Sequence, residues 1–424
     1  MLREDPERIR DNLRKRNMLD FPIEELLSLD TQRRELITSN QRLKTERNQI
    51  SIEIAQKKRE KSDASELIAQ MKTVSDQISE NDNETSTIEQ RFQEIAIRLP
   101  NFMEPDVPIG PDDSFNKPIE KWGNPIETKT LDHVDLSAIF DLIDVERAAK
   151  TSGARFYFLK RDLVRLNYAL LTSGLDFLRS KGFILIQPPY MLKREAIGGA
   201  IIFSDFEDVI YKIQDEDLYL IGTSEHAMAA MHMDEIFGSE DLPLKYAGVS
   251  PCFRKEAGAH GKDTKGIFRV HQFDKVEQFV FCQPSDSRKE HEMLLANALD
   301  FMKMLGIPHR AVILSSGDMG KVAAKTVDIE CWVPSQGTYR EMISCSNCTD
   351  FQARSLGIKF REKAHEESKF VHTLNSTLVA TTRTLVPLLE TYYRQDTNTI
   401  EIPKVIRPYM MGQEEIRAVP RRAA

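Results

Sequence analysis

Apolar residues in the first hundred positions recur with the spacing of long helices. No proline or glycine occurs between Pro22 and Pro100, and residues that favour helices are abundant there. A repeat of seven runs through Leu29, Leu36, Leu43 and Ile50, with Ile54 extending it. Alternating steps of four and three join a second set: Leu67, Met71, Val74, Ile78, Asn81, Thr85, Ile88, Phe92 and Ile95. Both stripes predict a coiled-coil seam, with Asn81 and Thr85 as polar interruptions.

The two helical stripes are separated by a polar segment, residues 57–66, that suits a chain reversal. Two helices joined by a short turn pack antiparallel. We therefore expect a helical hairpin whose helices of about 30 residues are each ~45 Å long.

The two expected helices differ in charge. Residues 31–61 carry nine basic residues: Arg33, Arg34, Arg42, Lys44, Arg47, Lys57, Lys58, Arg59 and Lys61. The second helix carries acidic residues, among them Asp76, Glu80, Asp82, Glu84 and Glu89. The pattern favours charge pairing between the helices, and it also fits a basic helix that grips a phosphate backbone.

The pattern changes after residue 100. Residues 100–125 are rich in Pro, Asp and Asn and predict an irregular entry segment. From about 130, short β-rich runs such as "FILIQPP" and "AVILSS" alternate with helical stretches at 161–181 and 285–305. The chain is therefore expected to be α+β, with a helical-hairpin domain over 1–110 and a catalytic domain over 111–424.

Composition narrows the class of protein. The 424 residues have a formal net charge of −8, so any contact with nucleic acid must come from a local basic patch. Five cysteines in so long a chain argue against a disulfide scaffold. The start of the sequence is too charged for a signal peptide, and no apolar run approaches the ~20 residues of a membrane helix. We expect a cytoplasmic protein without a membrane contact.

The segment 251–281 concentrates cations among apolar residues. We expect two strands there, with Arg254 and Glu256 on one face of the first, and alternation of Phe268, Val270 and Gln272 against Arg269, His271 and Phe273 in the second. Between them, "AGAHGKDTKG" predicts a mobile cationic loop. Arginine forks suit phosphate oxygens, and Phe273 offers a flat face for a base, so the segment predicts a polyphosphate site as well as it predicts an exposed hairpin.

Three further segments contain side chains that could take part in the same polyphosphate site. "IGTSEHAM" places Thr223 and Glu225 at a strand end, with His226 beginning a helix. "YREMISCSNC" places Glu341 and Ser344 on a strand, where they could hold Mg²⁺ beside a polyphosphate. "VHTLNSTLVATTRTLVPLLE" leads into an apolar helix carrying Arg383.

These segments resemble the three signature motifs of class II aminoacyl-tRNA synthetases. "GFILIQPPYM", with Pro189, resembles motif 1, "FRKEAGAHGKDTKGIFRVHQFDKVE" motif 2, and "LNSTLVATTRTLVPLLE" motif 3. The chain is similar to the seryl-tRNA synthetase family along nearly its whole length. The N-terminal hairpin resembles the helical arm that, in this family, grips the long variable arm of the tRNA.

The resemblance implies a fold and an activity. It implies an antiparallel catalytic sheet of six to seven strands flanked by helices, and a homodimer formed through motif 1. It implies an ATP-dependent ligase that activates L-serine as seryl-adenylate and transfers it to the 3′ end of serine tRNA. Mg²⁺ is the implied metal, and charging of selenocysteine tRNA is a further family expectation.

The resemblance also implies a role for each matching residue. Arg254 would hold the α-phosphate and the serine carboxylate, and Arg383 the outer phosphates, which makes these two the catalytic residues. The ATP site would comprise Arg254, Lys255, Glu256, Val270, His271, Gln272, Phe273, Glu341, Met342, Ile343, Ser344 and Arg383, with Phe273 stacked on adenine. Mg²⁺ would be held by Glu341 and Ser344. The serine site would comprise Thr223 and Glu225 for the amino group, with Ser224 between them in the serine loop, Arg254 for the carboxylate, and Glu277, Asn375 and Thr377 for the hydroxyl.

Alternatives to an active ligase have their own signatures. An amino-acid-activating relative that loads a carrier protein would lack residues 30–97, and a non-catalytic tRNA-binding paralogue would have lost Arg254, Glu341 or Arg383. Cys345-x-x-Cys348 could bind zinc, but no second pair at ligand spacing follows, so we interpret these cysteines as structural. His226, His271 and His372 are interpreted as packing or pocket-wall residues. Motif 3 departs from the usual glycine-rich text at Ala380, Thr381 and Thr382.

Overall fold

The chain forms two compact units. The computed structural model describes residues 2–127, 130–256, 265–363 and 365–418. The first unit spans Met1–Pro100 and the second Asn101–Ala424. The first unit therefore ends before the expected boundary at residue 110. Residues 101–110 belong to the second unit because they hydrogen-bond within it: the Asn101 amide donates to the Lys321 carbonyl (2.8 Å), and the Gly317 amide donates to the Gly110 carbonyl (2.9 Å).

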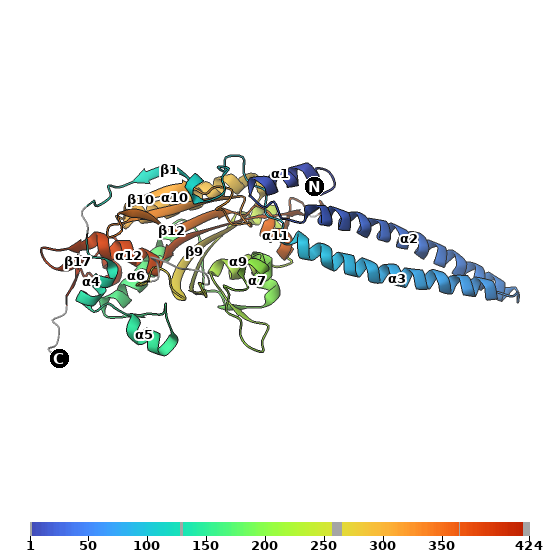
Figure 1. The fold of residues 1–424 in the computed structure, drawn as a ribbon, viewed down its shortest axis with the longest axis horizontal. Coiled ribbons are helices and arrows are strands. Elements are labelled where there is room, and N and C mark those ends of the chain that lie inside the picture. The colour runs from blue at the N-terminus through green and yellow to red at the C-terminus, as the bar shows by residue number, and fades with distance from the viewer. Residues whose placement is uncertain (1, 128–129, 257–264, 364, 419–424) are drawn as a thin grey trace. The chain divides into compact units, whose positions relative to one another are not determined.

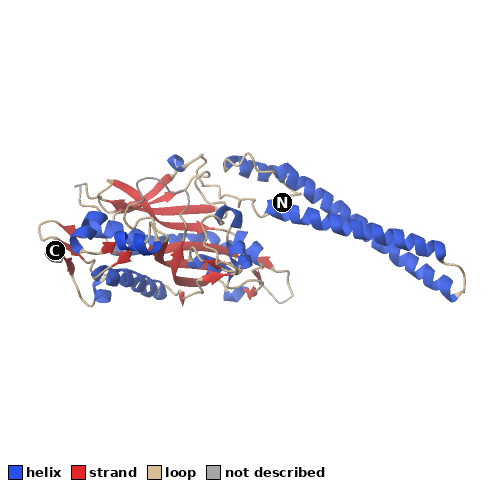
Figure 2. Ribbon diagram, turned by 60° about the horizontal axis from the view of Figure 1, so that its bottom comes forward, coloured by secondary structure: helices blue, strands red, loops and turns tan. Residues whose placement is uncertain are grey.

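The first unit is a helical hairpin, as the apolar spacing predicted. A short helix α1 (Pro6–Lys15) precedes α2 (Ile23–Arg59) and α3 (Ser65–Ala96). The two long helices lie side by side in both views (Figure 1, Figure 2) and pack along most of their length. The turn between them falls inside the polar segment 57–66. With 37 residues, α2 is about 55 Å long, which exceeds the expected ~45 Å.

The seam of the hairpin contains most of the predicted apolar residues. Buried members include Leu43, Ile50, Ile54, Val74, Ile78, Ile88, Phe92 and Ile95, whereas Leu29 and Leu36 are only half-buried. Asn40 is also buried and donates to Asp82 Oδ1 across the seam (2.7 Å). A polar residue of this kind fixes the register of a coiled coil.

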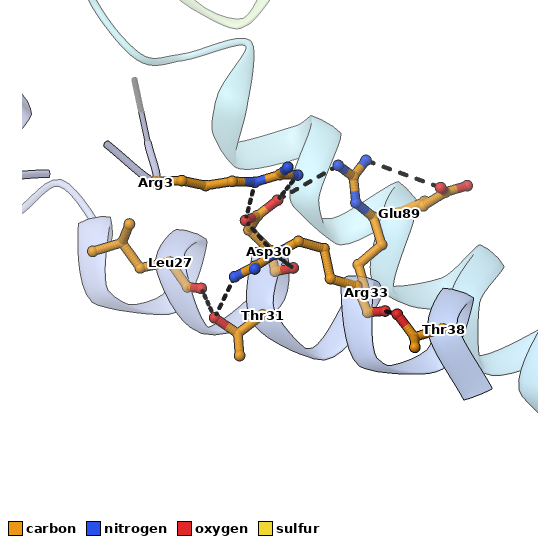
Figure 3. Close-up of polar contacts among 8 residues, drawn as sticks. Arg3, Leu27, Asp30, Thr31, Arg33, Thr38 and Glu89 are labelled. Carbon is orange, nitrogen blue, oxygen red and sulfur yellow. Dashed lines mark hydrogen bonds and ion pairs between the residues drawn. The ribbon is translucent and has the colours of Figure 1, made fainter. Parts of the chain in front are cut away.

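The carboxylate of Asp30 on α2 is buried in the hairpin and forms ion pairs with three arginines (Figure 3). Its oxygens lie 2.9 Å from Arg3 Nε, 3.0 Å from Arg34 Nε and 3.5 Å from Arg33 Nη2. Arg33 also pairs with Glu89 of α3 at 4.0 Å. The hydrogen bond from Arg3, with the charges of the three arginines, lowers the pKa of Asp30, so this network joins the start of the chain to the hairpin.

The second unit is built on an eight-stranded sheet in the described part of the chain. Its strand order is β1 (Lys117–Trp122), β10 (His309–Ile313), β11 (Lys325–Val333), β12 (Thr338–Asn347), β15 (His372–Ala380), β9 (Gln272–Cys282), β8 (Leu244–Phe253) and β4 (Ile184–Ile186). Neighbours are antiparallel except β4 and β8, which are parallel. The sheet therefore has more strands than the expected six to seven, and one parallel pair at its edge.

Helices cover both faces of this sheet. The helices α6 (Asp162–Ser180), α10 (Ser287–Met304) and α12 (Thr381–Tyr392) pack in the larger core, and α7 (Arg194–Ala200), α9 (Ser224–Ala230) and α11 (Phe351–Leu356) in the smaller one. Successive side chains of β9 point to opposite faces of the sheet. Gln278 faces α10, where its Nε2 donates to the Leu294 carbonyl (3.2 Å), and Glu277 points to the other face.

Shorter elements complete the second unit. They are α4 (His133–Phe140), α5 (Val145–Ser152), α8 (Phe203–Phe206), β2 (Ile143–Asp144), β3 (Phe158–Leu159), β5 (Met191–Leu192), β6 (Tyr219–Leu220), β7 (Ile236–Gly238), β13 (Lys359–Arg361), β14 (Lys369–Phe370), β16 (Tyr393–Arg394), β17 (Thr399–Glu401) and β18 (Glu415–Arg417). No helix among the described residues has the length and apolar character needed to cross a lipid bilayer.

The expected strand pair around segment 251–281 needs correction at its tip. β8 ends at Phe253, and Glu256 has a φ of +49°, so Arg254 and Glu256 do not share a strand face. β9 begins at Gln272, so the predicted alternation of residues 268–271 is wrong. The backbone leaves the ladder there because the His271 amide donates to the Arg155 carbonyl (3.1 Å). Most of the expected cationic loop, residues 257–264, lies outside the described residues.

Candidate active site

A cavity of about 380 Å³ lies in the second unit and is lined by residues of its central strands. β8, β9, β12 and β15 contribute side chains, as do the starts of α9 and α12. Eleven of the residues predicted from the sequence line it: Thr223, Glu225, Arg254, Phe273, Glu277, Glu341, Met342, Ser344, Asn375, Thr377 and Arg383. Segments separated by more than a hundred residues in the sequence therefore meet at one site.

The other predicted residues do not line this cavity. They are Ser224, Lys255, Glu256, Val270, His271, Gln272 and Ile343. Val270 and Ile343 belong to the apolar core, and the Ser224 hydroxyl donates to the Gly248 carbonyl (3.3 Å) beneath the site. His271 Nδ1 lies 2.8 Å from the Arg254 carbonyl, so its position fixes the backbone that carries Arg254.

Glu225, in the first turn of α9, receives two amide donors. Gln352 Nε2 and Asn375 Nδ2 lie 3.0 and 3.2 Å from the same oxygen, Oε1. Desolvation, followed by the charge of Glu277, raises the pKa of Glu225 to about 7, although Lys275 and the Gln352 hydrogen bond act in the opposite direction. The described residues bring no donor to Oε2, so that oxygen is open to a cationic ligand.

Glu277 is buried on β9 and paired on the same strand. The ammonium of Lys275, two positions earlier, forms an ion pair with Glu277 Oε2, and the two side chains are 6% and 2% exposed. The Thr377 hydroxyl of neighbouring β15 donates to the same oxygen (3.0 Å). Register explains the contact, since Thr377 is the partner of Glu277 in the antiparallel ladder.

Arg254 follows the end of β8 and reaches into the cavity. Its Nε donates to the Gly222 carbonyl (3.2 Å), and its guanidinium carbon lies 5.3 Å from the centre of the Phe273 ring. A cation over an aromatic face is attracted by the ring quadrupole. The contact positions the guanidinium at the same ring that the sequence predicted as the platform for adenine.

Arg383, in the first turn of α12, pairs with Glu341. Its Nη1 lies 2.8 Å from Glu341 Oε1, and its guanidinium carbon lies 5.7 Å from the centre of the Phe268 ring. Glu341 and Ser344 are three positions apart and would point to opposite faces of a regular strand. The register between β11 and β12 shifts at this point, where Glu330 pairs with Glu341 and Ile329 with Ile343, and this β-bulge lets both side chains line the cavity.

Asp328 of β11 stands directly across from Ser344 in the ladder. It is buried, its side chain is hydrogen-bonded to Ser344, and its Oδ1 has no hydrogen-bond partner. Desolvation and the nearby Glu341 raise the pKa of Asp328. A cluster of hard oxygen atoms with an unsatisfied member suits a cation such as Mg²⁺. No group of three His, Cys, Asp or Glu side chains in the described ranges forms a protein-only metal site.

His226 lines the cavity as a neutral imidazole. It is buried, and its Nδ1 has no hydrogen-bond partner. Desolvation, with the charges of Arg254 and Lys275, lowers its pKa to about 3. The interpretation of His226 as a pocket-wall residue agrees with this place.

Sequence reasoning missed several residues of the site, chiefly Lys275, Gln352 and Asp328. A signal existed for Lys275, because "FDKVEQFVF" places a Lys and a Glu two apart in an apolar strand, where neither charge can stay unpaired. Gln352 carried no such signal, since it lies in a short helix and reaches Glu225 only through the fold. The five cysteines are all free and buried, Cys345 and Cys348 among them.

The basic helix of the hairpin is a second candidate surface. Only some of its cations pair with α3, for example Lys44 with Asp82 (3.6 Å). Six of the cations noted in the sequence have no ion-pair partner within the described ranges: Arg42, Arg47, Lys57, Lys58, Arg59 and Lys61. Charge pairing therefore accounts for part of the pattern. The outer end of α2 and the turn that follows it keep positive charge that forms no ion pair within the described residues.

Comparisons with known proteins cover both units. The sequence model described as the seryl-tRNA synthetase N-terminal domain matches residues 1–103, and the tRNA synthetase class II core domain (G, H, P, S and T) matches residues 209–392. A serine–tRNA ligase of Nitrosopumilus maritimus is 54% identical over 98% of this chain and 99% of its own. One of Cenarchaeum symbiosum is 52% identical over 98% and 99%.

Solved structures agree with the sequence relatives. The crystal structure of seryl-tRNA synthetase from Pyrococcus horikoshii complexed with ATP superposes with a TM-score of 0.94, at 45% identity and with 99% of each chain covered. The predicted α+β architecture, a coiled-coil hairpin followed by a mostly antiparallel catalytic sheet, is confirmed. The chain therefore belongs to the seryl-tRNA synthetase family.

Proposed function

We propose that this chain is a serine–tRNA ligase, which activates L-serine with ATP and transfers the seryl group to the 3′ end of serine tRNA. The main support for this proposal is the set of side chains that line one cavity. Two arginines, 254 and 383, line it together with the carboxylates Glu225 and Glu277 and the hydroxyl of Thr377. Anion-binding and ammonium-binding groups together suit a nucleotide and an amino acid in the same site.

In the first step, a carboxylate oxygen of serine attacks the α-phosphorus of ATP. A phosphorus–oxygen bond to the acyl group forms, the bond to the leaving pyrophosphate breaks, and seryl-adenylate results. In the second step, a terminal hydroxyl of the tRNA attacks the acyl carbon and AMP leaves. Neither step needs a protein nucleophile, so the enzyme acts by positioning and by stabilising charge.

The cavity residues fit these tasks. Arg254 would bind the α-phosphate and the serine carboxylate, and Arg383 would bind the outer phosphates after exchanging its contact with Glu341. Phe273 would stack on adenine. Glu225, assisted by Thr223, would receive the serine ammonium, and Glu277 with Thr377 its hydroxyl. A buried site that hydrogen-bonds a hydroxyl rejects alanine strongly, by ~10⁴-fold, because its polar groups would be left unpaired.

Mg²⁺ would be held by Glu341 and Ser344. Both carry hard oxygen atoms and both line the cavity, and the unsatisfied Oδ1 of Asp328 adds a further acceptor behind Ser344. Mg²⁺ is commonly bound by one or two protein oxygens together with substrate phosphates, so two ligands suffice. When bound, the ion would neutralise negative charge on the phosphates.

The hairpin would bind the tRNA. The unpaired cations at the outer end of α2 suit contacts with a phosphate backbone, which are sequence-independent and weaken with salt. We propose the hairpin as the tRNA-binding domain and the second unit, residues 101–424, as the catalytic domain. The contact with selenocysteine tRNA expected from the family would use the same surface.

Two further proposals concern assembly and compartment. β4, at the edge of the sheet, exposes Ile184 (51%) and Leu185 (40%), and α6 exposes Tyr168 (63%). An apolar sheet edge of this kind favours a protein partner, and we propose a homodimer formed by the motif 1 segment. The free cysteines fit a reducing compartment, and we propose the cytoplasm.

Pyrophosphate exchange with a panel of amino acids tests the function. Serine-dependent exchange followed by charging of serine tRNA is the expected result. Exchange without tRNA charging would support the carrier-loading alternative, and no exchange with any amino acid would support a non-catalytic paralogue.

A further inference from the structure

Gln352 is a fully buried amide that touches the predicted serine site from behind. It lies on α11 and is 0% exposed. Its Nε2 lies 3.0 Å from Glu225 Oε1 and 3.0 Å from the Ala200 carbonyl oxygen. Its Oε1 accepts a hydrogen bond from the Thr373 hydroxyl on β15 (2.7 Å). All polar atoms of this side chain are therefore engaged.

These contacts determine which way the amide points. The Ala200 carbonyl can only accept, so the atom facing it must be the amide nitrogen. The second N–H of the same nitrogen then reaches Glu225 Oε1, which must be an acceptor as well. The Thr373 hydroxyl donates on the opposite side and keeps the amide from turning over. A chain of hydrogen bonds thus runs from the Thr373 hydroxyl through the Gln352 amide to one oxygen of Glu225.

The surroundings of Glu225 make this donor necessary. Burial and the neighbouring Glu277 favour its neutral form, and they raise the pKa of Glu225 to about 7. The cations facing it are Lys275 on β9 and Arg254 after β8, His226 on α9 is neutral, and the Cys348 thiol is buried and protonated. The donors at Oε1 are Gln352 and Asn375, and Asn375 also contacts Cys348 Sγ (3.5 Å).

We propose that Gln352 is a positioning residue for serine recognition. Fixed by Thr373, it stabilises the carboxylate form of Glu225, with Oε1 engaged and Oε2 free for the ammonium group of the amino acid. This inference rests on the proposed function, since it names what orients the group that would bind serine. Gln352 itself does not line the cavity, so it would act through Glu225.

The test is Gln352→Met in the full-length enzyme, which keeps length and volume and removes the donors. In serine-dependent pyrophosphate exchange we expect half-saturation by serine to rise roughly 10- to 100-fold, the loss typical of a hydrogen bond to a charged group. Half-saturation by ATP should stay within about twofold, because the nucleotide contacts are elsewhere in the cavity. Unchanged half-saturation by serine would overturn the proposal.

A pH profile separates positioning from mere packing. Without its donor, Glu225 gains a still higher pKa and stays protonated further into the alkaline range. The serine defect should therefore be largest near pH 6.5 and shrink towards pH 8.5. A defect that is equal at all pH values, or that affects ATP equally, would indicate a structural role and would also overturn the proposal.

Gln278→Met is the matched control. Gln278 is an equally buried glutamine, but it lies on β9 and donates to α10 on the opposite face of the sheet. It should lose stability to a similar extent without a selective serine defect. If the unmodified enzyme shows no serine-dependent exchange, the proposed function fails; if it is active and Gln352→Met binds serine normally, only the inference about Gln352 fails.

Thr373→Val supplies a second route if Gln352→Met does not fold. Valine has nearly the shape of threonine but cannot donate to Gln352 Oε1, so the amide loses its orientation. The same selective defect is expected, at roughly 3- to 10-fold for a neutral hydrogen bond. Normal half-saturation by serine in a folded Thr373→Val enzyme, judged by circular dichroism, would contradict the proposed chain of hydrogen bonds.

Discussion

In the hairpin, the ion pair between Arg91 and Glu25 joins side chains that are 51% and 41% exposed. In the second unit, which we call the catalytic unit, the ion pair between Lys275 and Glu277 joins side chains that are only 6% and 2% exposed. The same chemistry has different energetics in the two places. An exposed pair is screened by water and contributes little. A buried pair has lost its hydration, so removal of one partner leaves an uncompensated charge.

The difference fits the binding functions that we propose for the two units. A surface that contacts a long phosphate backbone needs hydrated cations that can adapt, and the outer end of α2 provides them. A cavity that recognises one small amino acid needs charges held in place before the substrate arrives. The catalytic unit achieves this with interlocked donors around Glu225 and Glu277.

The largest effect is expected for the two arginines of the cavity. Arg254→Ala and Arg383→Ala should each reduce serine-dependent pyrophosphate exchange by roughly 10³-fold, because each removes a preorganised positive charge from the reacting phosphates. Arg288→Ala serves as the control, since Arg288 is 79% exposed on α10. Exchange at the normal rate in either cavity variant would refute the assignment of that arginine.

Removal of a buried charge should affect stability next most strongly. Lys275→Met leaves Glu277 buried without its ammonium partner and should lower the free energy of unfolding by about 3–5 kcal/mol. Denaturant unfolding followed by the signal of the catalytic unit measures the change. A loss below about 1 kcal/mol would show that this pair behaves like an exposed one, and the contrast between the units would disappear.

Shortening the hairpin tests its separate role. Replacement of residues 43–79, beyond the Asn40–Asp82 hydrogen bond, by a short Gly-Ser turn removes every cation of α2 and its turn that forms no ion pair within the described residues, except Arg42, and should reduce tRNA charging on the order of 100-fold. Serine-dependent pyrophosphate exchange should remain within about twofold, because no cavity residue is removed. Normal charging by the shortened enzyme would contradict a tRNA-binding hairpin.

His226 gives a pH-dependent prediction for the catalytic unit. Its pKa is lowered to about 3 in the fold but returns to about 6.5 on unfolding, so protons bind the unfolded state first as the pH falls. The contribution of His226 to stability is complete above pH 6.5 and decreases below it, by about 2 kcal/mol at pH 5. Denaturant unfolding at pH 7.5 and 5.0 should show this loss, and His226→Asn should lack that share of it.

The smallest effect is expected in the hairpin. Arg91→Ala breaks the exposed pair with Glu25, so the change in the free energy of unfolding should be much smaller than for Lys275→Met and should decrease further with added salt. Thermal unfolding at low and high salt measures it. An effect as large as that of Lys275→Met would mean that exposure does not govern these pairs.

Much of the hairpin could be predicted from the sequence because its contacts are local and periodic. The spacing of Val74, Ile78, Ile88 and Phe92 alone identifies one face of a helix, and these side chains are buried. Asp30 shows the limit of this reasoning. Nothing in its sequence neighbourhood indicates that it is buried, because one of its arginines, Arg3, comes from 27 positions earlier.

In the catalytic unit, the prediction was strongest where a motif carries its own chemistry and weakest where the backbone leaves regular structure. Arg254, Glu225 and Arg383 all line the cavity. The alternation assumed for residues 268–271 was wrong, because β9 begins only at Gln272. The β-bulge that turns Glu341 and Ser344 to one side likewise could not be predicted from the amino-acid sequence of the strand.

Periodicity and motifs are properties of neighbouring residues, so they suffice to predict the two-part architecture, the family resemblance and a set of side chains able to bind a nucleotide and an amino acid. Which of these side chains share a cavity, and which lie behind it, depends on how the chain folds. Gln352, Asp328 and Lys275 matter through their burial beside particular partners, and burial is decided by how distant strands and helices pack. The preorganised charge of the site therefore comes from the fold.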